Sequence, residues 1–212
     1  MDVIPAINEA NFEEVKKKIL LAQSFGAEWA HIDVADGKFT KNILWNNPAD
    51  LLNVKGQLSN VKIEVHLMAE SPEDVLENWL KTGIKRIFIH YESISDFELL
   101  RDKCEADGVE LGLAIGPHIP AEGLFEYKGK ANYFLILAVE PGVSGQKFQE
   151  NQLEKIRALR EKIPNAKIEV DGGVNIHNVF DIKQAGADIL ISASYIWNSK
   201  NPKEAYQLLT SV

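Results

Sequence analysis

The chain has 212 residues, 45% of them hydrophobic, which is enough apolar sequence to bury one full-sized core. Its formal net charge of -8 at pH 7 argues against nucleic-acid binding, because nucleic-acid affinity comes largely from lysines and arginines that neutralise phosphates. No apolar run reaches the roughly 18 residues of a membrane span. No signal peptide precedes the first apolar segment, and the single cysteine, Cys104, excludes an internal disulfide. We therefore expect a cytoplasmic protein.

Apolar runs of strand length alternate with segments of helical period along the chain. The predicted strand–helix pairs, in chain order, are 3–7 with 12–25, 29–34 with 48–58, 62–68 with 72–82, 86–91 with 96–106, 110–115 with 120–127, 133–139 with 151–163, 167–170 with 176–185, and 189–193 with 202–209. Eight such units in residues 1–212 predict an α/β fold, a single-domain (β/α)8 TIM barrel with parallel strands. A doubly wound open sheet is the alternative. It would usually carry a G-x-G-x-x-G turn after its first strand, where this chain has none.

Two histidines and two aspartates stand where predicted strands end. His31 and Asp33 are two residues apart and point to the same face of their strand, while His66 ends the third strand and Asp171 the seventh. In such barrels the carboxyl ends of the strands meet on one face, where catalytic groups lie. Two imidazoles and two carboxylates suit one divalent metal ion, zinc first, with iron, manganese or cobalt as alternatives. Each residue alone could merely cap a loop, but four in register favour a site.

Glycine-rich turns after the sixth and seventh strands, and a serine after the eighth, suit a phosphate bound by backbone N–H groups. The candidate phosphate-binding residues are Gly142, Val143, Ser144, Gly145, Gly172, Gly173, Ala193 and Ser194. Because the chain is acidic overall, such a site must be local rather than a basic patch. Residues 146–148 are predicted to begin a mobile loop over the substrate. A metal site beside a phosphate site suggests proton chemistry on a phosphorylated sugar.

Four segments, at 31–39, 65–68, 140–148 and 168–174, make the chain resemble the ribulose-phosphate 3-epimerases, which interconvert D-ribulose 5-phosphate and D-xylulose 5-phosphate. The resemblance implies that His31, Asp33, His66 and Asp171 bind one divalent metal and that Asp33 and Asp171 transfer the protons. It also implies that His66 and the glycine-rich turns contact the substrate. Two carboxylates on opposite faces of a carbon can invert it through an enediolate, one as base and one as acid. No organic cofactor is then required.

Several residues on the substrate side depart from the family pattern. Ala6 stands where the family has a serine that contacts the substrate, and Asn8 stands where it has an apolar residue, so the Asn8 amide is a candidate replacement. Met68 remains beneath the expected substrate position, but Ala35 and Leu137 replace two other methionines, and we expect Ala35 to enlarge the floor of the site. These changes leave three interpretations: a drifted epimerase, an epimerase for another ketose phosphate such as a hexulose 6-phosphate, or a non-catalytic sugar-phosphate-binding relative.

Four further points stay open from the sequence. His90 ends the fourth strand and is either a residue of the site or a structural histidine. Asp36 is a candidate to orient His31 or His66. A decarboxylase acting on a keto-sugar phosphate would need a lysine beside the acidic pair, whereas Lys38 lies beyond the turn. Barrels of this type often form homo-oligomers through their helices, and no membrane partner is expected.

Overall fold

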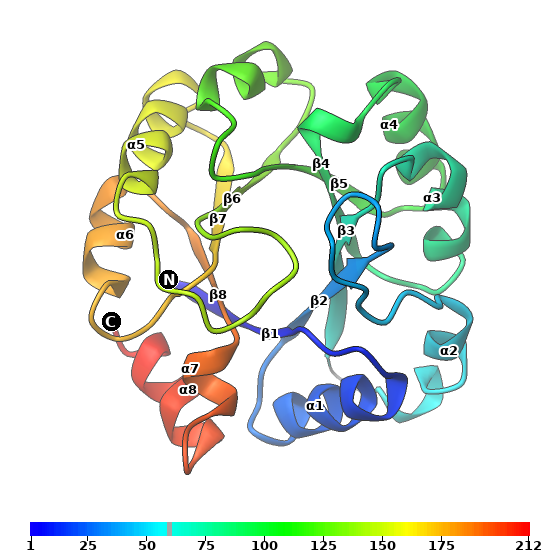
Figure 1. Ribbon diagram of the computed structural model, residues 1–212, viewed down its shortest axis with the longest axis vertical. Helices are drawn as coiled ribbons and strands as arrows, with labels where there is room; N and C mark the ends of the chain where they lie inside the picture. Colours follow the sequence, from blue (N-terminus) through cyan, green and yellow to red (C-terminus); the bar gives the residue numbers. More distant parts are fainter. Residues whose placement is uncertain (59–60) are drawn as a thin grey trace.

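The strands form a closed parallel barrel in the computed structural model, which describes residues 1–58 and 61–212 (Figure 1). Each strand pairs with the next one in the chain, and β1 pairs with β8 to close the ring. The predicted (β/α)8 barrel is therefore confirmed, and the open doubly wound sheet is excluded. The strands are β1 (Asp2–Ile7), β2 (Trp29–Ala35), β3 (Lys62–Met68), β4 (Arg86–His90), β5 (Glu110–Ile115), β6 (Tyr133–Leu137), β7 (Lys167–Asp171) and β8 (Ile189–Ser192).

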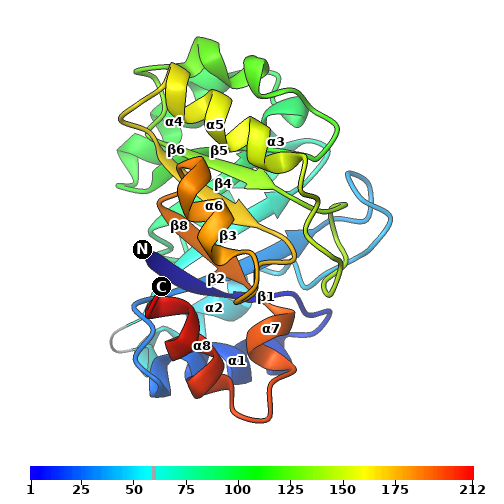
Figure 2. The same ribbon diagram turned by 90° about the vertical axis from the view of Figure 1, so that its left-hand side faces the viewer.

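Helices surround the barrel on its outer side, as the end-on view (Figure 1) and the side view (Figure 2) show. None of the helices among the described residues is both long and apolar enough to cross a bilayer. The helices are α1 (Phe12–Ser24), α2 (Ala49–Leu52), α3 (Pro72–Leu80), α4 (Phe97–Ala106), α5 (Gln152–Lys162), α6 (Val179–Ala185), α7 (Ser194–Trp197) and α8 (Pro202–Thr210), with 3-10 helices η1 (Lys55–Gln57), η2 (Tyr91–Ser93) and η3 (Ala121–Tyr127).

Two predicted helices are shorter or tighter than expected. The segment 48–58 forms the single turn α2 and then η1, which contains Gly56, a residue of low helix propensity. The segment 120–127 is the 3-10 helix η3 rather than an α-helix. It contains Gly123, where a Cβ atom would lie only 2.9 Å from the Tyr91 ring. Both segments are predicted as short helices, and each contains a glycine, a residue of low helix propensity.

The predicted helix 176–185 begins three residues late, at Val179. Asn178 Oδ1 accepts a hydrogen bond from Asn175 N at 2.9 Å, and Asn175 Oδ1 accepts one from His177 N at 2.9 Å. These side chains satisfy backbone N–H groups in a turn rather than in a helix. His177 therefore lies in the turn before α6 and not on the helix.

The apolar side chains of each strand divide between the barrel interior and the helices. On β1, Ile4 and Ala6 are buried in one cluster with residues of β4, β5, β6 and β8. Ile7 belongs to a different cluster and packs with Val15 and Ile19 of α1. Because successive residues of a strand point to opposite faces, the interior face of β1 continues from Ile4 and Ala6 to position 8.

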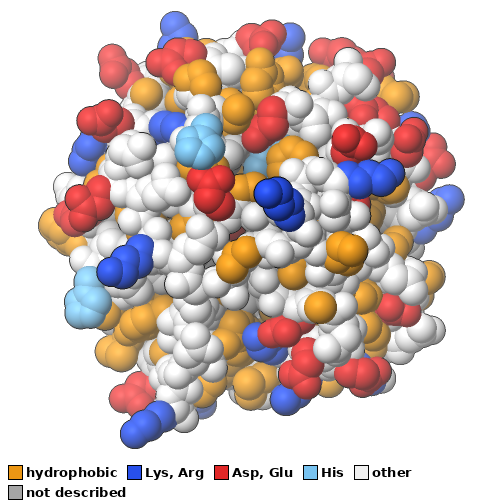
Figure 3. Space-filling model, viewed as in Figure 1, with side chains coloured by type: hydrophobic (Ala, Val, Ile, Leu, Met, Phe, Trp, Pro, Cys, Tyr) orange, Lys and Arg blue, Asp and Glu red, His pale blue; other side chains and the backbone are white. Residues whose placement is uncertain are grey.

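The end of the barrel that faces the viewer in Figure 1 carries charged side chains of both signs. Figure 3 shows lysine, arginine, aspartate and glutamate side chains interspersed on this face. Any anion bound here must therefore rely on local hydrogen-bond donors rather than on a broad basic surface.

Candidate active site

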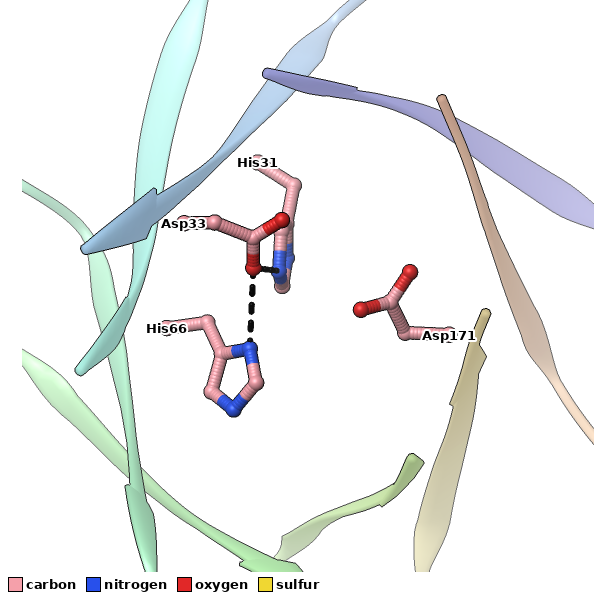
Figure 4. Close-up of side chains that lie close together, drawn as sticks. All are labelled: His31, Asp33, His66 and Asp171. Atoms are coloured by element: carbon pink, nitrogen blue, oxygen red, sulfur yellow. Dashed lines mark hydrogen bonds and ion pairs between the residues drawn. The ribbon is translucent and has the colours of Figure 1, made fainter. Parts of the chain in front are cut away.

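Four polar side chains from three strands converge inside the barrel near the carboxyl ends of the strands (Figure 4). His31 and Asp33 come from β2, His66 from β3 and Asp171 from the last position of β7. All four are buried, and one ligand atom from each lies within 4.8 Å of the others. The structure thus brings together the four residues that the sequence nominated as metal ligands.

Asp33 is the centre of the hydrogen-bond network in this cluster. Its Oδ1 lies 3.0 Å from His66 Nδ1 and 3.4 Å from His31 Nε2. Its Oδ2 accepts a hydrogen bond from the Asn8 side-chain amide at 3.0 Å. Both oxygens of the carboxylate are therefore fixed by residues of three different strand ends.

The ring of His31 is oriented by Glu64, which lies beside it on β3. Glu64 Oε1 is 2.8 Å from His31 Nδ1, and a carboxylate can only accept, so the Nδ1–H group donates. His31 Nε2 is then left facing Asp33 Oδ1, and it is a buried atom with no hydrogen-bond partner among the described residues. A buried nitrogen aimed at a carboxylate oxygen calls for a cation between them, and this arrangement fits a divalent metal ion.

The two aspartates have opposite pKa shifts. Burial raises the pKa of Asp171 to about 7, with a further contribution from the negative charge of Asp33. Burial acts in the same direction on Asp33, but its contacts with His31 and His66 outweigh it and hold the pKa of Asp33 far below its usual value. Near neutral pH, Asp33 is ionised while Asp171 can hold a proton.

The two histidines also differ in pKa. Burial lowers the pKa of His66 to about 4, so its ring is neutral at pH 7. Burial lowers the pKa of His31 as well, but its contacts with the carboxylates of Asp33 and Glu64 more than offset this and raise it well above the usual value. A positive charge is thus favoured between His31 and the Asp33 carboxylate.

His90 belongs to the same network. His66 Nε2 lies 2.9 Å from His90 Nε2, and His90 Nδ1 lies 3.1 Å from Glu92 Oε1. His90 is fully buried. His90 therefore contacts one of the four nominated residues, His66, directly.

A buried ion-pair cluster lies next to His31 in the barrel interior. Arg86 Nη1 lies 2.8 Å from Glu64 Oε2 and 2.7 Å from Glu169 Oε1, and its guanidinium packs over the rings of Trp29 and Tyr133. Burial, and then the charge of Glu64, raise the pKa of Glu169 well above its usual value. Sequence reasoning missed this cluster.

The alternation of side chains along the strands already indicated this cluster. Glu64 and Glu169 each stand two residues before a nominated site residue, His66 and Asp171. Residues two apart on a strand share a face, so both glutamates had to point into the barrel. Two buried carboxylates require a buried cation, and that requirement would have pointed to Arg86.

A cavity beside the His/Asp cluster is lined by the predicted phosphate turns. Its lining includes Asn8, Asp33, His66, Met68 and Asp171, together with Gly142, Val143, Ser144, Gly145, Gly172, Gly173, Ala193 and Ser194. Gly173 has φ +70°, and a Cβ atom there would lie 2.2 Å from Phe148 N. Only glycine fits that position, because the turn after β7 passes directly against the loop after β6.

Two residues nominated from the family pattern lie away from this cavity. Ala6 is fully buried in the barrel interior, and its carbonyl accepts a hydrogen bond from Trp197 Nε1. Ala35 is fully buried in a cluster with Leu44 and Met68, with Phe39 packed against it. The expectation that Ala35 enlarges the floor of the site is therefore wrong, since neighbouring side chains fill that space.

Asp36 organises the loop after β2 instead of orienting a histidine. Its Oδ1 accepts hydrogen bonds from Lys38 N and Phe39 N, and its Oδ2 accepts one from Glu70 N. The expectation that Asp36 orients His31 or His66 is wrong. Glu64 contacts His31 in that role, on a strand rather than on a loop.

The loops after β2 and β6 meet over the mouth of the barrel. Thr40 Oγ1 donates to Pro141 O at 3.1 Å, and Gln146 Nε2 donates to the carbonyls of Glu140 and Val143 at 2.7 and 2.8 Å. The loop after β6 is thus tied both to itself and to its neighbour across the cavity.

Comparison with known proteins gives a consistent result over the whole length. The family model described as "Ribulose-phosphate 3 epimerase family" matches residues 2–197. The ribulose-phosphate 3-epimerase of Helicobacter pylori (strain J99) is 34% identical over 100% of this chain and 98% of its own length. The chloroplastic ribulose-5-phosphate-3-epimerase of Arabidopsis thaliana is 32% identical, over 96% of this chain and 74% of its own.

Solved structures with lower identity share the fold. A 3-keto-L-gulonate-6-phosphate decarboxylase from Vibrio cholerae superposes with a TM-score of 0.76 at 10% identity, over 99% of this chain and 95% of that chain. A 3-hexulose-6-phosphate synthase superposes with a TM-score of 0.73 at 14% identity, over 100% of this chain and 99% of that chain. At these identities the likeness concerns the barrel alone.

Proposed function

Because this chain belongs to the ribulose-phosphate 3-epimerase family of isomerases, we propose that it interconverts D-ribulose 5-phosphate and D-xylulose 5-phosphate. The observation that carries the proposal is the buried pair Asp33 and Asp171, drawn together from β2 and β7 around two histidines. Inversion at C3 requires one group to remove a proton from one face of the carbon and another to return one to the opposite face. A pair of carboxyls on two sides of a cavity meets that requirement.

Asp33 and Asp171 divide the two proton-transfer roles. Asp33 is ionised at neutral pH and is therefore the base for one epimer. Asp171, from β7, lines the same cavity and is placed to return a proton to the opposite face of the carbon. Their roles exchange in the reverse direction.

His31, Asp33, His66 and Asp171 would hold one divalent cation, for which we propose zinc. When bound, such a cation supplies Lewis-acid stabilisation of the negative charge that develops on the substrate oxygens after C3 loses its proton. The residues themselves orient the site: Glu64 fixes the His31 ring, and Asn8 holds Asp33 Oδ2.

The substrate phosphate would bind at the turns after β6, β7 and β8. Gly173 brings its backbone close to the loop that contains Phe148, and Ser194 begins α7 next to the same cavity. Backbone N–H groups in such turns bind a phosphate without a lysine or arginine. This arrangement suits a chain whose net charge is -8.

The test is turnover of purified, zinc-loaded protein on D-ribulose 5-phosphate in deuterium oxide, followed by NMR at C3. Formation of D-xylulose 5-phosphate with deuterium at C3 is the expected result. Deuterium exchange or epimerisation with a hexulose 6-phosphate, but not with ribulose 5-phosphate, would move the proposal to another ketose phosphate. Sugar-phosphate binding without exchange on either substrate, with zinc bound, would indicate a non-catalytic relative and overturn the proposal.

A further inference from the structure

We propose that Glu92 and His90 act as a positioning relay for His66, fixing which ring nitrogen of His66 carries the proton and which faces Asp33. The inference rests on the proposed function for its purpose, since it concerns how the chain prepares a cation site. It assigns a role to two residues outside the four nominated ligands.

The relay is a continuous chain of contacts across two neighbouring strands. His66 lies on β3 and His90 ends β4, and their rings stack with centroids 5.0 Å apart and an angle of 28° between their planes. Both histidines are fully buried. The Phe39 ring packs against His90 at a centroid distance of 4.5 Å. The His90 ring is therefore confined between two other rings.

Glu92 determines the protonation pattern at one end. Its Oε1 accepts a hydrogen bond from Gly116 N at 3.2 Å and lies 3.1 Å from His90 Nδ1. An oxygen that already accepts from a backbone N–H is an acceptor for His90 as well, so His90 Nδ1 carries the hydrogen. In a neutral imidazole the other nitrogen is then bare, and His90 Nε2 is an acceptor.

The protonated nitrogen of His90 determines which nitrogen of His66 carries a hydrogen. Because His90 Nε2 accepts, the 2.9 Å contact requires that His66 Nε2 donates. A histidine that binds a metal is neutral, so His66 Nδ1 is the bare nitrogen, and that atom lies 3.0 Å from Asp33 Oδ1. Two acceptors at this distance are stable only with a cation between them. The opposite pattern would place two bare atoms, His90 Nδ1 and Glu92 Oε1, against each other.

The two histidines are thus prepared by two separate carboxylates. Glu64 binds His31 Nδ1 directly and leaves Nε2 facing Asp33 Oδ1. Glu92 acts on His66 through His90 and leaves Nδ1 facing the same oxygen. Hydrogen-bond partners of this kind typically change metal affinity about 10- to 100-fold when they are removed.

The test uses zinc affinity, measured by competition with a chromophoric chelator, and ring 15N NMR of the zinc-loaded protein labelled in histidine. We expect His90→Phe to weaken zinc binding about 10- to 100-fold. His90→Gln should stay within a few-fold of the parent, because its amide oxygen can accept from His66 and its NH2 can donate to Glu92. In the parent protein, NMR should show a proton on His66 Nε2 and on His90 Nδ1.

Two further variants keep the test decisive. Glu92→Leu removes the acceptor for His90 Nδ1, so it should also weaken zinc binding even if His90→Phe fails to fold. Ser93→Ala removes only the 2.9 Å hydrogen bond from Ser93 Oγ to His90 O and should leave zinc affinity unchanged. Parent-like zinc affinity in His90→Phe or Glu92→Leu, or a proton on His90 Nε2, would overturn the relay.

The outcome is separable from that of the proposed function. If zinc affinity and the NMR pattern are as expected but ribulose 5-phosphate is not turned over, the relay is supported and the proposed substrate is contradicted. If turnover occurs while the relay variants bind zinc like the parent, the relay is contradicted and the proposed function is still supported.

Discussion

The side-chain amide of Asn8 donates a hydrogen bond to Asp33 Oδ2 at 3.0 Å, joining the end of β1 to the proposed catalytic base. Asn8 continues the interior face of β1, two residues beyond Ala6. The family pattern places a polar side chain at position 6. In this chain the polar side chain is Asn8, two residues closer to the carboxyl end of the barrel. The exchange keeps a hydrogen-bond donor in the site and moves it from the expected substrate side to the carboxylate.

Asn8→Leu should lower kcat/KM about 10- to 100-fold. The estimate follows from a hydrogen bond to a charged group, which contributes about 1.5–3 kcal/mol. Steady-state kinetics on ribulose 5-phosphate measure the effect. Unchanged kinetics in this variant would show that the Asn8 contact does not support Asp33.

Asn11→Ala is the matched control for Asn8. Asn11 Oδ1 accepts from Glu14 N at 3.1 Å and caps α1, so its loss should lower the free energy of unfolding by about 1 kcal/mol. The kinetic constants should not change, because the cap lies outside the cavity. The pair of variants separates an effect on the site from an effect on stability.

Gly173→Ala should raise KM strongly. Its new Cβ atom would lie 2.2 Å from Phe148 N, so the turn after β7 has to move away from the proposed phosphate position. Gly26→Ala is the matched control, since Gly26 also has a positive φ, +87°, but a Cβ there meets no described atom within 4 Å. Both variants should lose about 1 kcal/mol or more of stability from the strained φ. Only Gly173→Ala should change KM, and an equal change in both would contradict the proposed phosphate site.

The barrel could be predicted from the sequence because its signal is local, whereas several contacts of the site are not local. Strand and helix periods lie within short windows, and the ends of β2, β3 and β7 already carried His31, His66 and Asp171. The buried contact of Arg86 with Glu169 joins positions 83 residues apart, so only closure of the barrel reveals it. The role of His90 could not be decided from the sequence for the same reason. Its partner Glu92 is only two residues away, but its contact with His66 joins two different strands.

Asp33→Asn and Asp171→Asn should each lower the rate of epimerisation by about 10²- to 10⁴-fold, the usual contribution of a positioned general acid or base. The fold should persist, because an amide has nearly the same shape as the carboxyl group. Zinc content has to be measured with the rates, since both residues are also proposed ligands. Asp102→Asn, on the exposed side of α4, is the control and should keep parent activity. Normal activity in either site variant would rule out the two-base assignment.

Zinc affinity should rise with pH between 6 and 8. In the zinc-free protein the pKa of Asp171 is raised to about 7, so its carboxyl is protonated below pH 7 and must lose that proton to bind a cation. The pKa of His31 is also raised, which acts in the same direction. Each proton released on binding changes the affinity by up to about tenfold per pH unit. Chelator competition at pH 6, 7 and 8 measures the trend, and an affinity that is flat or falls with pH would contradict it.

Arg86→Met should lower the free energy of unfolding by about 3–5 kcal/mol, the usual effect of removing one partner from a buried ion pair. The change leaves the Glu64 carboxylate buried without its cation, and urea denaturation measures the loss. Arg101→Met is the matched control. Arg101 pairs with the exposed side chains of Glu98 and Asp102, so its loss should cost about 1 kcal/mol or less. Equal losses in the two variants would show that the Arg86 cluster contributes no more to stability than a surface ion pair.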